Sequence, residues 1–249
     1  MRAFARETRL SETSFVQPAA ADGADYRHRI WMMSGEIPFA GHPSLGTAVA
    51  VARARGLERA SFVQQTQPGL QQIDVEISGT TAKASMLQEP PSFGQELEPG
   101  ETLRMVGLDA ADADPRLPVR VVATGVPQVI VPIADAGRLG AATPDYDAIG
   151  ALLAAHDAIV YYLVVVDGPR VRARSFLRTA EMGEDPATGA AAGPLCAHVA
   201  DRTGVDAVEI DQGVEMGRPS RLRAAIEGDR VRVGGDAVVV LDGTLHLDF

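Results

Sequence analysis

The sequence predicts an α+β protein of two similar halves, in each of which a curved sheet surrounds one central helix. Three observations support this fold class. A turn followed by a helix occurs once in each half of the 249 residues, short alternating strands follow each copy, and both helices are apolar on every side. A helix that is apolar all round must be enclosed by protein, and a sheet wrapped around it satisfies that requirement.

The repeated motif has the frame x-Pro-x-x-Gly-[Thr/Ala]-Ala, followed by an apolar stretch. It reads GHPSLGTAVAVARARG at 41–56 and EDPATGAAAGPLCAHVADRTG at 184–204. A glycine ends each stretch, as in a left-handed C-cap. In this frame His42 and Asp185 occupy the same position, so we expect them to be counterparts.

Similar elements surround both copies of the motif. In chain order we expect a helix at 2–8, strands at 12–16 and 26–32, a helix at 47–54, strands within 62–86, two strands within 119–133, a helix at 148–155, strands at 159–166 and 171–177, a helix at 190–199, and strands within 209–235. The alternation of apolar and polar residues indicates the strands, and glycines mark the turns between them.

One segment indicates the boundary between the halves, and another indicates a difference between them. Residues 89–103, rich in Pro, Gly and Glu, are expected to form a surface loop or the linker between domains 1–105 and 106–249. The strand pair within 119–133 has no equivalent before the helix that follows Met1. If the halves are equivalent, we expect either a preceding strand pair of about 30 residues or an open sheet edge.

Composition excludes several classes of partner. With 33 acidic and 23 basic residues, the formal net charge of −10 disfavours nucleic acid and anionic lipid. The longest apolar run, 158–166, is far shorter than the roughly 20 residues of a membrane span. A single cysteine, Cys196, permits no intrachain disulfide and fits a reducing compartment, so we expect a cytoplasmic protein. The five histidines lack metal-binding spacing, and we expect no metal and no cofactor.

The start of each enclosed helix is expected to bind an anion. The first N–H groups of a helix have no partner within it and point outward, so residues 41–46 and 185–189 each offer an anion site that suits a carboxylate. The alternative roles are an N-cap for Asp185 and a hydrogen-bonded turn residue for His42.

Five segments occur in order across nearly the whole chain: LSETSFV, GEIPFAGHPSLGTA, ATGVPQVIV, GEDPATGAAAG and QGVEMGRPS. Together they resemble the signature segments of the PhzF-like isomerase family of phenazine biosynthesis. The resemblance implies two barrel-like, mostly antiparallel domains similar to those of diaminopimelate epimerases and proline racemases. It further implies an active site in the cleft between the two helix starts, and a homodimer.

The resemblance also implies roles for individual residues. Glu12 matches the catalytic glutamate of the family, Gly41 and His42 match its substrate-binding pair, and Asp185 and Gly189 match the second-domain counterparts. Ala190, the sixth site position, stands where many members have a serine, so a hydroxyl that could bind substrate is absent.

These residue types suit proton transfer between carbon atoms. Such a reaction needs a base that can return as an acid, in a site dry enough to raise a carboxyl pKa toward neutrality. We expect Glu12, on a strand face with Leu10 and Ser14, to be that group, and His42 to hold or relay the second proton. The predicted function is a cofactor-independent isomerase or epimerase that acts on a small carboxylate.

Two alternatives remain. One is a non-catalytic small-ligand-binding protein of the same fold, which the alanine at position 190 favours. The other, weaker, is a hydrolase in which Ser11 or Ser14 acts with His42 and Asp185, since the chain has no G-x-S-x-G motif.

Overall fold

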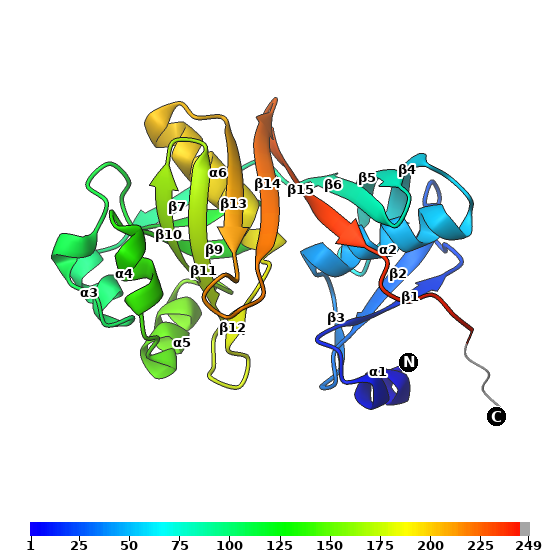
Figure 1. The fold of residues 1–249 in the computed structure, drawn as a ribbon, viewed down its shortest axis with the longest axis horizontal. Coiled ribbons are helices and arrows are strands. Elements are labelled where there is room, and N and C mark those ends of the chain that lie inside the picture. The colour runs from blue at the N-terminus through cyan, green and yellow to red at the C-terminus, as the bar shows by residue number, and fades with distance from the viewer. Residues whose placement is uncertain (245–249) are drawn as a thin grey trace. The chain divides into compact units, whose positions relative to one another are not determined.

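The computed structural model describes residues 1–244, which fall into two compact units. Unit 1 comprises Met1–Ser85 and a segment that begins at Gly235, and unit 2 comprises Met86–Gly234. These bounds differ from the domains 1–105 and 106–249 expected from the sequence. The strands β6 (Thr81–Leu87) and β15 (Arg230–Val238) carry the chain from one unit to the other (Figure 1).

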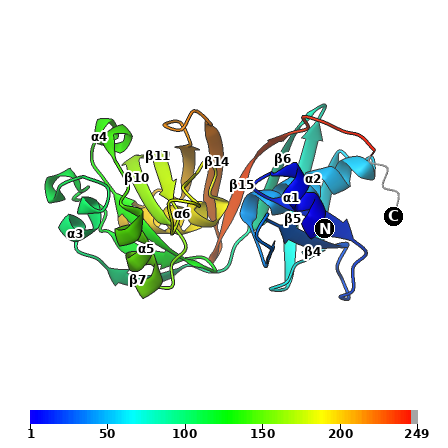
Figure 2. The ribbon, with the colours of Figure 1, turned by 90° about the horizontal axis from the view of Figure 1, so that it is seen from below.

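Unit 1 places one long helix against a mostly antiparallel sheet. Its elements are α1 (Arg2–Thr8), β1 (Thr13–Gln17), β2 (Tyr26–Trp31), β3 (Glu36–Ile37), α2 (Gly41–Ala54), β4 (Arg59–Gln65) and β5 (Leu70–Ser78), followed by β6. The strand order is β1-β2-β4-β5-β6, with β3 on β2. Strands β2 and β4 are parallel, whereas β1 and β2, β2 and β3, and β4 and β5 are antiparallel. Helix α2 contacts β1, β2, β4 and β5 (Figure 2). It exposes Ala50 and Arg53 on one side.

Unit 2 repeats this plan with more elements. They are β7 (Ser92–Glu96), α3 (Pro99–Arg104), the 3-10 helix η1 (Ala110–Asp112), β8 (Arg120–Ala123), β9 (Pro127–Pro132), α4 (Ala136–Ala141), α5 (Tyr146–Ala155), β10 (Tyr161–Asp167), β11 (Arg170–Phe176), β12 (Glu184–Asp185), α6 (Gly189–Thr203), β13 (Ala207–Gln212) and β14 (Ser220–Glu227). The strand order from β14 is β14-β13-β11-β10-β9-β8-β7, with β12 on β11.

Helix α6 is the centre of the larger core. Every residue from Ala191 to Val199 is buried, and side chains of β8–β11 and β13–β15 pack around it. A second cluster lies between the other face of this sheet and α3, α4 and α5. The prediction of an apolar helix enclosed by a curved sheet is therefore confirmed in unit 2, and the α+β fold class is confirmed for the chain.

The strand pair and the helix expected ahead of the second motif are present as β8, β9 and α5. The expectation of a surface loop or an inter-domain linker at 89–103 is wrong, because most of this segment forms β7 and α3 within unit 2. Pro99 takes the first helical position, where its missing N–H is not needed, and the Glu98 side chain caps the helix by accepting a hydrogen bond from the Glu101 N–H. Proline and glycine occur at helix starts as well as in loops, so their presence at 99 and 100 does not distinguish the two.

The two halves correspond in a different alignment from the one expected. Helix α2 begins at Gly41 and is followed by Gly56, and α6 begins at Gly189 and is followed by Gly204 with the same spacing. The turns before them read Gly-Glu-Ile-Pro at 35–38 and Gly-Glu-Asp-Pro at 183–186. Ile37 pairs with Ile30 in the first turn, as Asp185 pairs with Ser175 in the second.

In this alignment the counterpart of Asp185 is Ile37, and the counterpart of His42 is Ala190. The prediction that His42 and Asp185 are counterparts is wrong. It matched Pro43 with Pro186, but Pro43 lies in the first turn of α2 whereas Pro186 lies in the turn before α6. Proline is tolerated in both places, so it is a poor anchor for the alignment.

No helix within residues 1–244 is both long and apolar enough to cross a membrane.

Candidate functional site

A glutamate and a histidine meet in unit 1. Glu12 directly precedes β1, and His42 is the second residue of α2. The Glu12 Oε2 atom lies 3.0 Å from His42 Nε2, and the Glu12 side chain is 15% exposed whereas that of His42 is 49% exposed. Contacts between α2 and β1 bring together two residues that are far apart in the sequence. One side of this pair is therefore open to a ligand.

The environment of Glu12 does not raise its pKa. The hydrogen bond from His42 lowers the pKa of Glu12, burial acts in the opposite direction but more weakly, and Ser11 adds a second lowering hydrogen bond. The expectation of a pKa raised toward neutrality is therefore wrong. Glu12 also lies just before the strand rather than on its face, and Leu10 is exposed. At neutral pH Glu12 is a carboxylate, ready to accept a proton.

The start of α2 lacks a side-chain cap. Its N-cap residue, Ala40, has no polar side chain, and the N-cap Thr188 of α6 makes no capping hydrogen bond either. The first N–H groups of α2 and α6 therefore receive no side-chain cap from their N-cap residues, and they lie at the positive ends of two long helices. Helix ends of this kind favour anions, including carboxylates.

Asp185 is held in a hydrogen-bonded turn in unit 2. Its Oδ2 atom lies 2.6 Å from the Thr188 hydroxyl, and its carbonyl oxygen accepts a hydrogen bond of 2.6 Å from Gln212 Nε2. Gln212 also donates to Thr188 Oγ1 at 2.9 Å and accepts from the Tyr162 hydroxyl at 2.8 Å. Thr188 is the N-cap residue of α6, so the alternative role of Asp185 as that N-cap is wrong.

The first turn of α6 is fixed by a glutamine. Gln88 Nε2 donates to the Gly189 carbonyl oxygen at 3.0 Å, and Gln88 Oε1 accepts from the Thr124 hydroxyl at 2.5 Å. A Cβ atom at Gly193 would lie 1.9 Å from Gln88 Oε1, so a larger residue there would displace the Gln88 side chain from these hydrogen bonds. These contacts position Gly189 and Ala190 without a side chain of their own.

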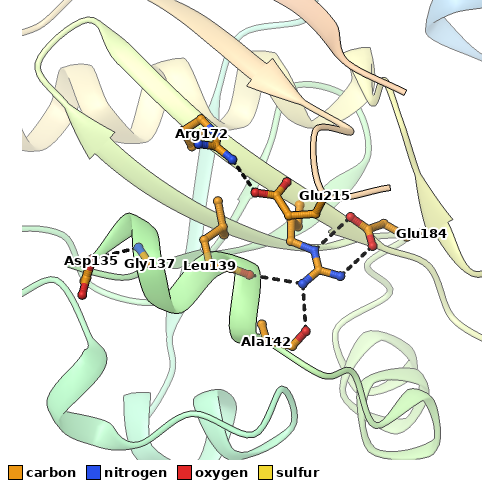
Figure 3. Close-up of polar contacts among 8 residues, drawn as sticks. Asp135, Gly137, Leu139, Ala142, Arg172, Glu184 and Glu215 are labelled. Carbon is orange, nitrogen blue, oxygen red and sulfur yellow. Dashed lines mark hydrogen bonds and ion pairs between the residues drawn. The ribbon is translucent and has the colours of Figure 1, made fainter. Parts of the chain in front are cut away.

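Sequence reasoning missed an arginine clamp beside Asp185. Arg174 makes two hydrogen bonds to the Glu184 carboxylate and donates to the carbonyl oxygens of Leu139 and Ala142, so its guanidinium links β11, the acidic turn and the end of α4 (Figure 3). Unit 1 has the same pair in Arg29 and Glu36. The missed signal is Arg-x-[Trp/Phe] ahead of Gly-Glu-x-Pro, which occurs at 29–38 and 174–186.

The serine of the hydrolase alternative has another partner. Ser14 Oγ lies 2.9 Å from Nε2 of the buried His28, and the Thr47 hydroxyl lies 3.1 Å from the same nitrogen. Ser11 contributes to the environment of Glu12 instead. Among residues 1–244, His, Cys, Asp and Glu side chains form no cluster of three or more that could hold a metal ion, and metal and cofactor independence stay predictions.

Glu12 and His42 belong to unit 1, whereas Asp185, Gly189 and Ala190 belong to unit 2. Within each unit the structure brings the predicted residues together: Glu12 with His42, and Asp185 with the start of α6. The shared cleft between the halves stays a prediction, as do the catalytic and substrate-binding roles.

Known proteins resemble this chain over nearly its whole length. The family model described as phenazine biosynthesis-like protein matches residues 1–243. The chain is 35% identical to trans-2,3-dihydro-3-hydroxyanthranilate isomerase of Pseudomonas fluorescens, over 99% of this chain and 88% of that protein. It is 32% identical to an isomerase of Mesorhizobium japonicum that is described as uncharacterized, over 99% of this chain and 88% of that one.

Solved structures give the same picture. A predicted epimerase from Pseudomonas aeruginosa superposes with a TM-score of 0.81 at 31% identity, covering 97% of this chain and 88% of that one. A hydroxyproline epimerase from Agrobacterium vitis shares the fold, with a TM-score of 0.63 at 12% identity, over 92% of this chain and 72% of that one. The whole-chain family match and relatives above 30% identity show that the chain belongs to the phenazine biosynthesis-like (PhzF-like) family and is an isomerase.

Proposed function

We propose that this isomerase moves a proton between two carbon atoms of a small carboxylate, with Glu12 as the general acid/base, in the cleft that the sequence predicts between the halves. The single observation that carries this proposal is the hydrogen bond between Glu12 and His42. It keeps Glu12 ionised and lies at an uncapped helix start that suits an anion.

The reaction balances within the substrate. The Glu12 carboxylate removes a proton from one carbon, the electron pair that the C–H bond releases moves into the adjoining unsaturated system, and the Glu12 carboxyl group returns the proton to another carbon. No oxidant or reductant is needed. Negative charge develops on the substrate during this step, and N–H groups at helix starts stabilise such charge.

His42 supports both stages. While Glu12 is ionised, the His42 Nε2–H donates to it, and the open side of the imidazole can hold or relay a second proton. The substrate-binding groups we propose are the N–H groups at Gly41 and His42, together with Asp185, Gly189 and Ala190 of the second turn and helix start.

The names of some relatives support a substrate class. Three relatives from Pseudomonas are named trans-2,3-dihydro-3-hydroxyanthranilate isomerase, and we propose that this chain acts on that compound or on a related cyclic carboxylate. The methyl group of Ala190 offers no hydroxyl at the position that corresponds to His42, which supports a substrate with one polar group fewer there. We further propose a homodimer in the cytoplasm.

Deuterium exchange tests the proposal. Incubation of the substrate with the protein in deuterated water should place deuterium at the acceptor carbon, read by NMR, and Glu12→Gln should slow this exchange by at least about a hundredfold. Binding of the carboxylate without any exchange would instead support the non-catalytic ligand-binding alternative. Exchange by Glu12→Gln within about tenfold of the unmodified protein would show that another group is the acid/base.

A further inference from the structure

Two arginines on strand β11 of unit 2 are each neutralised by a carboxylate. Arg172 and Arg174 alternate along the strand, so both side chains leave the same face. Arg174 pairs with Glu184, and Arg172 pairs with Glu215, whose side chain is only 14% exposed (Figure 3). This face of unit 2 therefore holds two guanidinium groups and two matching carboxylates.

Unit 1 has the same two arginines but one carboxylate fewer. Arg27 and Arg29 occupy β2 with the same spacing, and Arg29 pairs with Glu36 as Arg174 pairs with Glu184. Gln67 is the equivalent of Glu215, because it lies as many residues after Gly56 as Glu215 lies after Gly204. A neutral amide therefore replaces the second carboxylate. Within residues 1–244, no Asp or Glu lies within ion-pair distance of Arg27.

The position of the neighbouring strand leaves space beside Arg27. Gln64 and Gln212 are equivalent, since they lie at the same spacing after Gly56 and Gly204. Gln64 pairs with Tyr26, whereas Gln212 pairs with Ala173, which is the equivalent of His28 and not of Tyr26. Strand β4 is thus displaced along β2, and the turn that follows it begins at the level of Arg27. A cavity of about 260 Å³ lies there, and its lining includes Arg27, Arg29, Glu36, Gln65, Thr66 and Gln67.

The groups around this cavity leave Arg27 available to a ligand. The charge of Arg27 contributes to lowering the pKa of Glu36, but both Glu36 oxygens already accept hydrogen bonds from Arg29. Gln65 Oε1 accepts from the N–H groups of Ala20 and Ala21, which leaves its Nε2 as a donor. The cavity therefore offers a guanidinium fork and an amide donor, which match the two oxygens of a carboxylate.

We propose that this cavity binds the carboxylate group of a small organic acid at Arg27, in the place that the Glu215 carboxylate takes beside Arg172 in unit 2. The site is lined by other residues than the Glu12 and His42 pair, and it goes beyond the proposed isomerisation. Ile37 and Pro38 line the cavity and lie shortly before α2, so an occupant contacts the turn that precedes the helix of His42.

The binding experiment uses the whole chain and three probes: acetate, succinate and benzoate. Each is titrated at constant ionic strength, and binding is read from the NMR shifts of the amide groups at Gln65, Thr66 and Gln67. At least one probe should give saturable shifts, and Arg27→Gln should weaken its binding by about tenfold or more. Equal shifts with chloride, or unchanged binding to Arg27→Gln, would overturn the proposal.

Matched variants exchange the neutral amide and the carboxylate between the equivalent positions 67 and 215 of the two units. Gln67→Glu places a carboxylate where unit 2 has one and should weaken probe binding by about tenfold or more. Gln72→Glu adds the same charge at an exposed position of β5 that does not line the cavity, and should leave binding within about twofold. Glu215→Gln should create a second carboxylate site at Arg172. Equal effects of Gln67→Glu and Gln72→Glu would show that net charge, and not this cavity, governs binding.

A second copy of the chain is the other source of a carboxylate for Arg27. An acidic side chain from a second copy at Arg27 would appear as a concentration-dependent mass in light scattering that Arg27→Gln abolishes. That result, without saturable shifts from any of the three probes, would also overturn the small-acid site.

Discussion

Glu12 Oε2 and His42 Nε2 are 3.0 Å apart, and their hydrogen bond lowers the pKa of Glu12 although burial of the carboxyl acts in the other direction. The ionised form is the resting form of this base. A proton taken from a carbon atom must therefore be given up again readily, since a carboxyl group with a low pKa is a good acid.

The first prediction concerns the pH dependence of activity. His42→Ala removes the main cause of the lowered Glu12 pKa, so the acidic limb of the kcat/KM profile should move to higher pH, and activity at neutral pH should fall by about tenfold or more. A pH-rate profile of both proteins checks this. An acidic limb that stays in place would contradict the assigned cause.

The same group should affect stability in acid. The folded-state pKa of Glu12 lies below its unfolded value, so its contribution is present above the unfolded pKa and is lost as pH falls through the folded pKa. Urea unfolding across the acidic range should therefore show a smaller loss of stability for Glu12→Gln than for the unmodified chain. Parallel curves for the two proteins would argue against this linkage.

The Arg174–Glu184 and Arg29–Glu36 pairs should differ in energy although each is joined by two side-chain hydrogen bonds. Arg174 and Glu184 are 10% and 13% exposed, so Arg174→Met leaves a buried carboxylate without its partner and should cost about 3–5 kcal/mol. Arg29 and Glu36 are more exposed, and Arg29→Met should cost about 1 kcal/mol or less. Chemical denaturation of both variants measures the difference, and equal losses would refute the dependence on burial.

Gln212 should be more important than its neutral side chain suggests. It joins Tyr162, Thr188 and the Asp185 carbonyl, and it is fully buried. Gln212→Leu strands these partners and should destabilise the chain by about 2–4 kcal/mol, whereas Leu at the exposed Gln72 should cost less than about 0.5 kcal/mol. Melting curves of the two variants test this, and similar midpoints would contradict it.

His28 provides a fifth prediction. Burial lowers its pKa to about 4, so the folded state holds it neutral while the unfolded state binds a proton near the ordinary histidine pKa. Its contribution to stability should be lost as pH falls from about 6.5 to about 4. Replacement by Gln should flatten this part of the stability curve. A slope unchanged in His28→Gln would assign it to other groups.

Much of this architecture follows from local sequence patterns. Alternating residues predict strands such as β10 and β11, and the apolar run after Gly189 predicts α6, because burial imposes these periods directly. Family resemblance alone predicted that Glu12 and His42 belong to one site, since Glu12 precedes β2 in the sequence, His42 follows it, and no local pattern links them.

Local sequence patterns could not predict several other features. The match of His42 with Asp185 failed because a proline fits both a turn and a first helical turn. The pKa of Glu12 depends on the balance of one hydrogen bond against burial, which only three-dimensional positions reveal. The role of Gln212 could not be predicted from the sequence, because an uncharged glutamine suits an exposed position as well as a buried one.

The course of β15 has a practical consequence. Because unit 1 takes its last strand from the C-terminal end of the chain, neither a single protease cut nor a simple truncation yields both units intact. A fragment that stops at Gly234 lacks the part of β15 that belongs to unit 1. A fragment that begins at Met86 keeps that part of β15 but lacks the rest of unit 1. Anyone who wishes to study the halves apart must rejoin the two pieces of the first one with a designed linker.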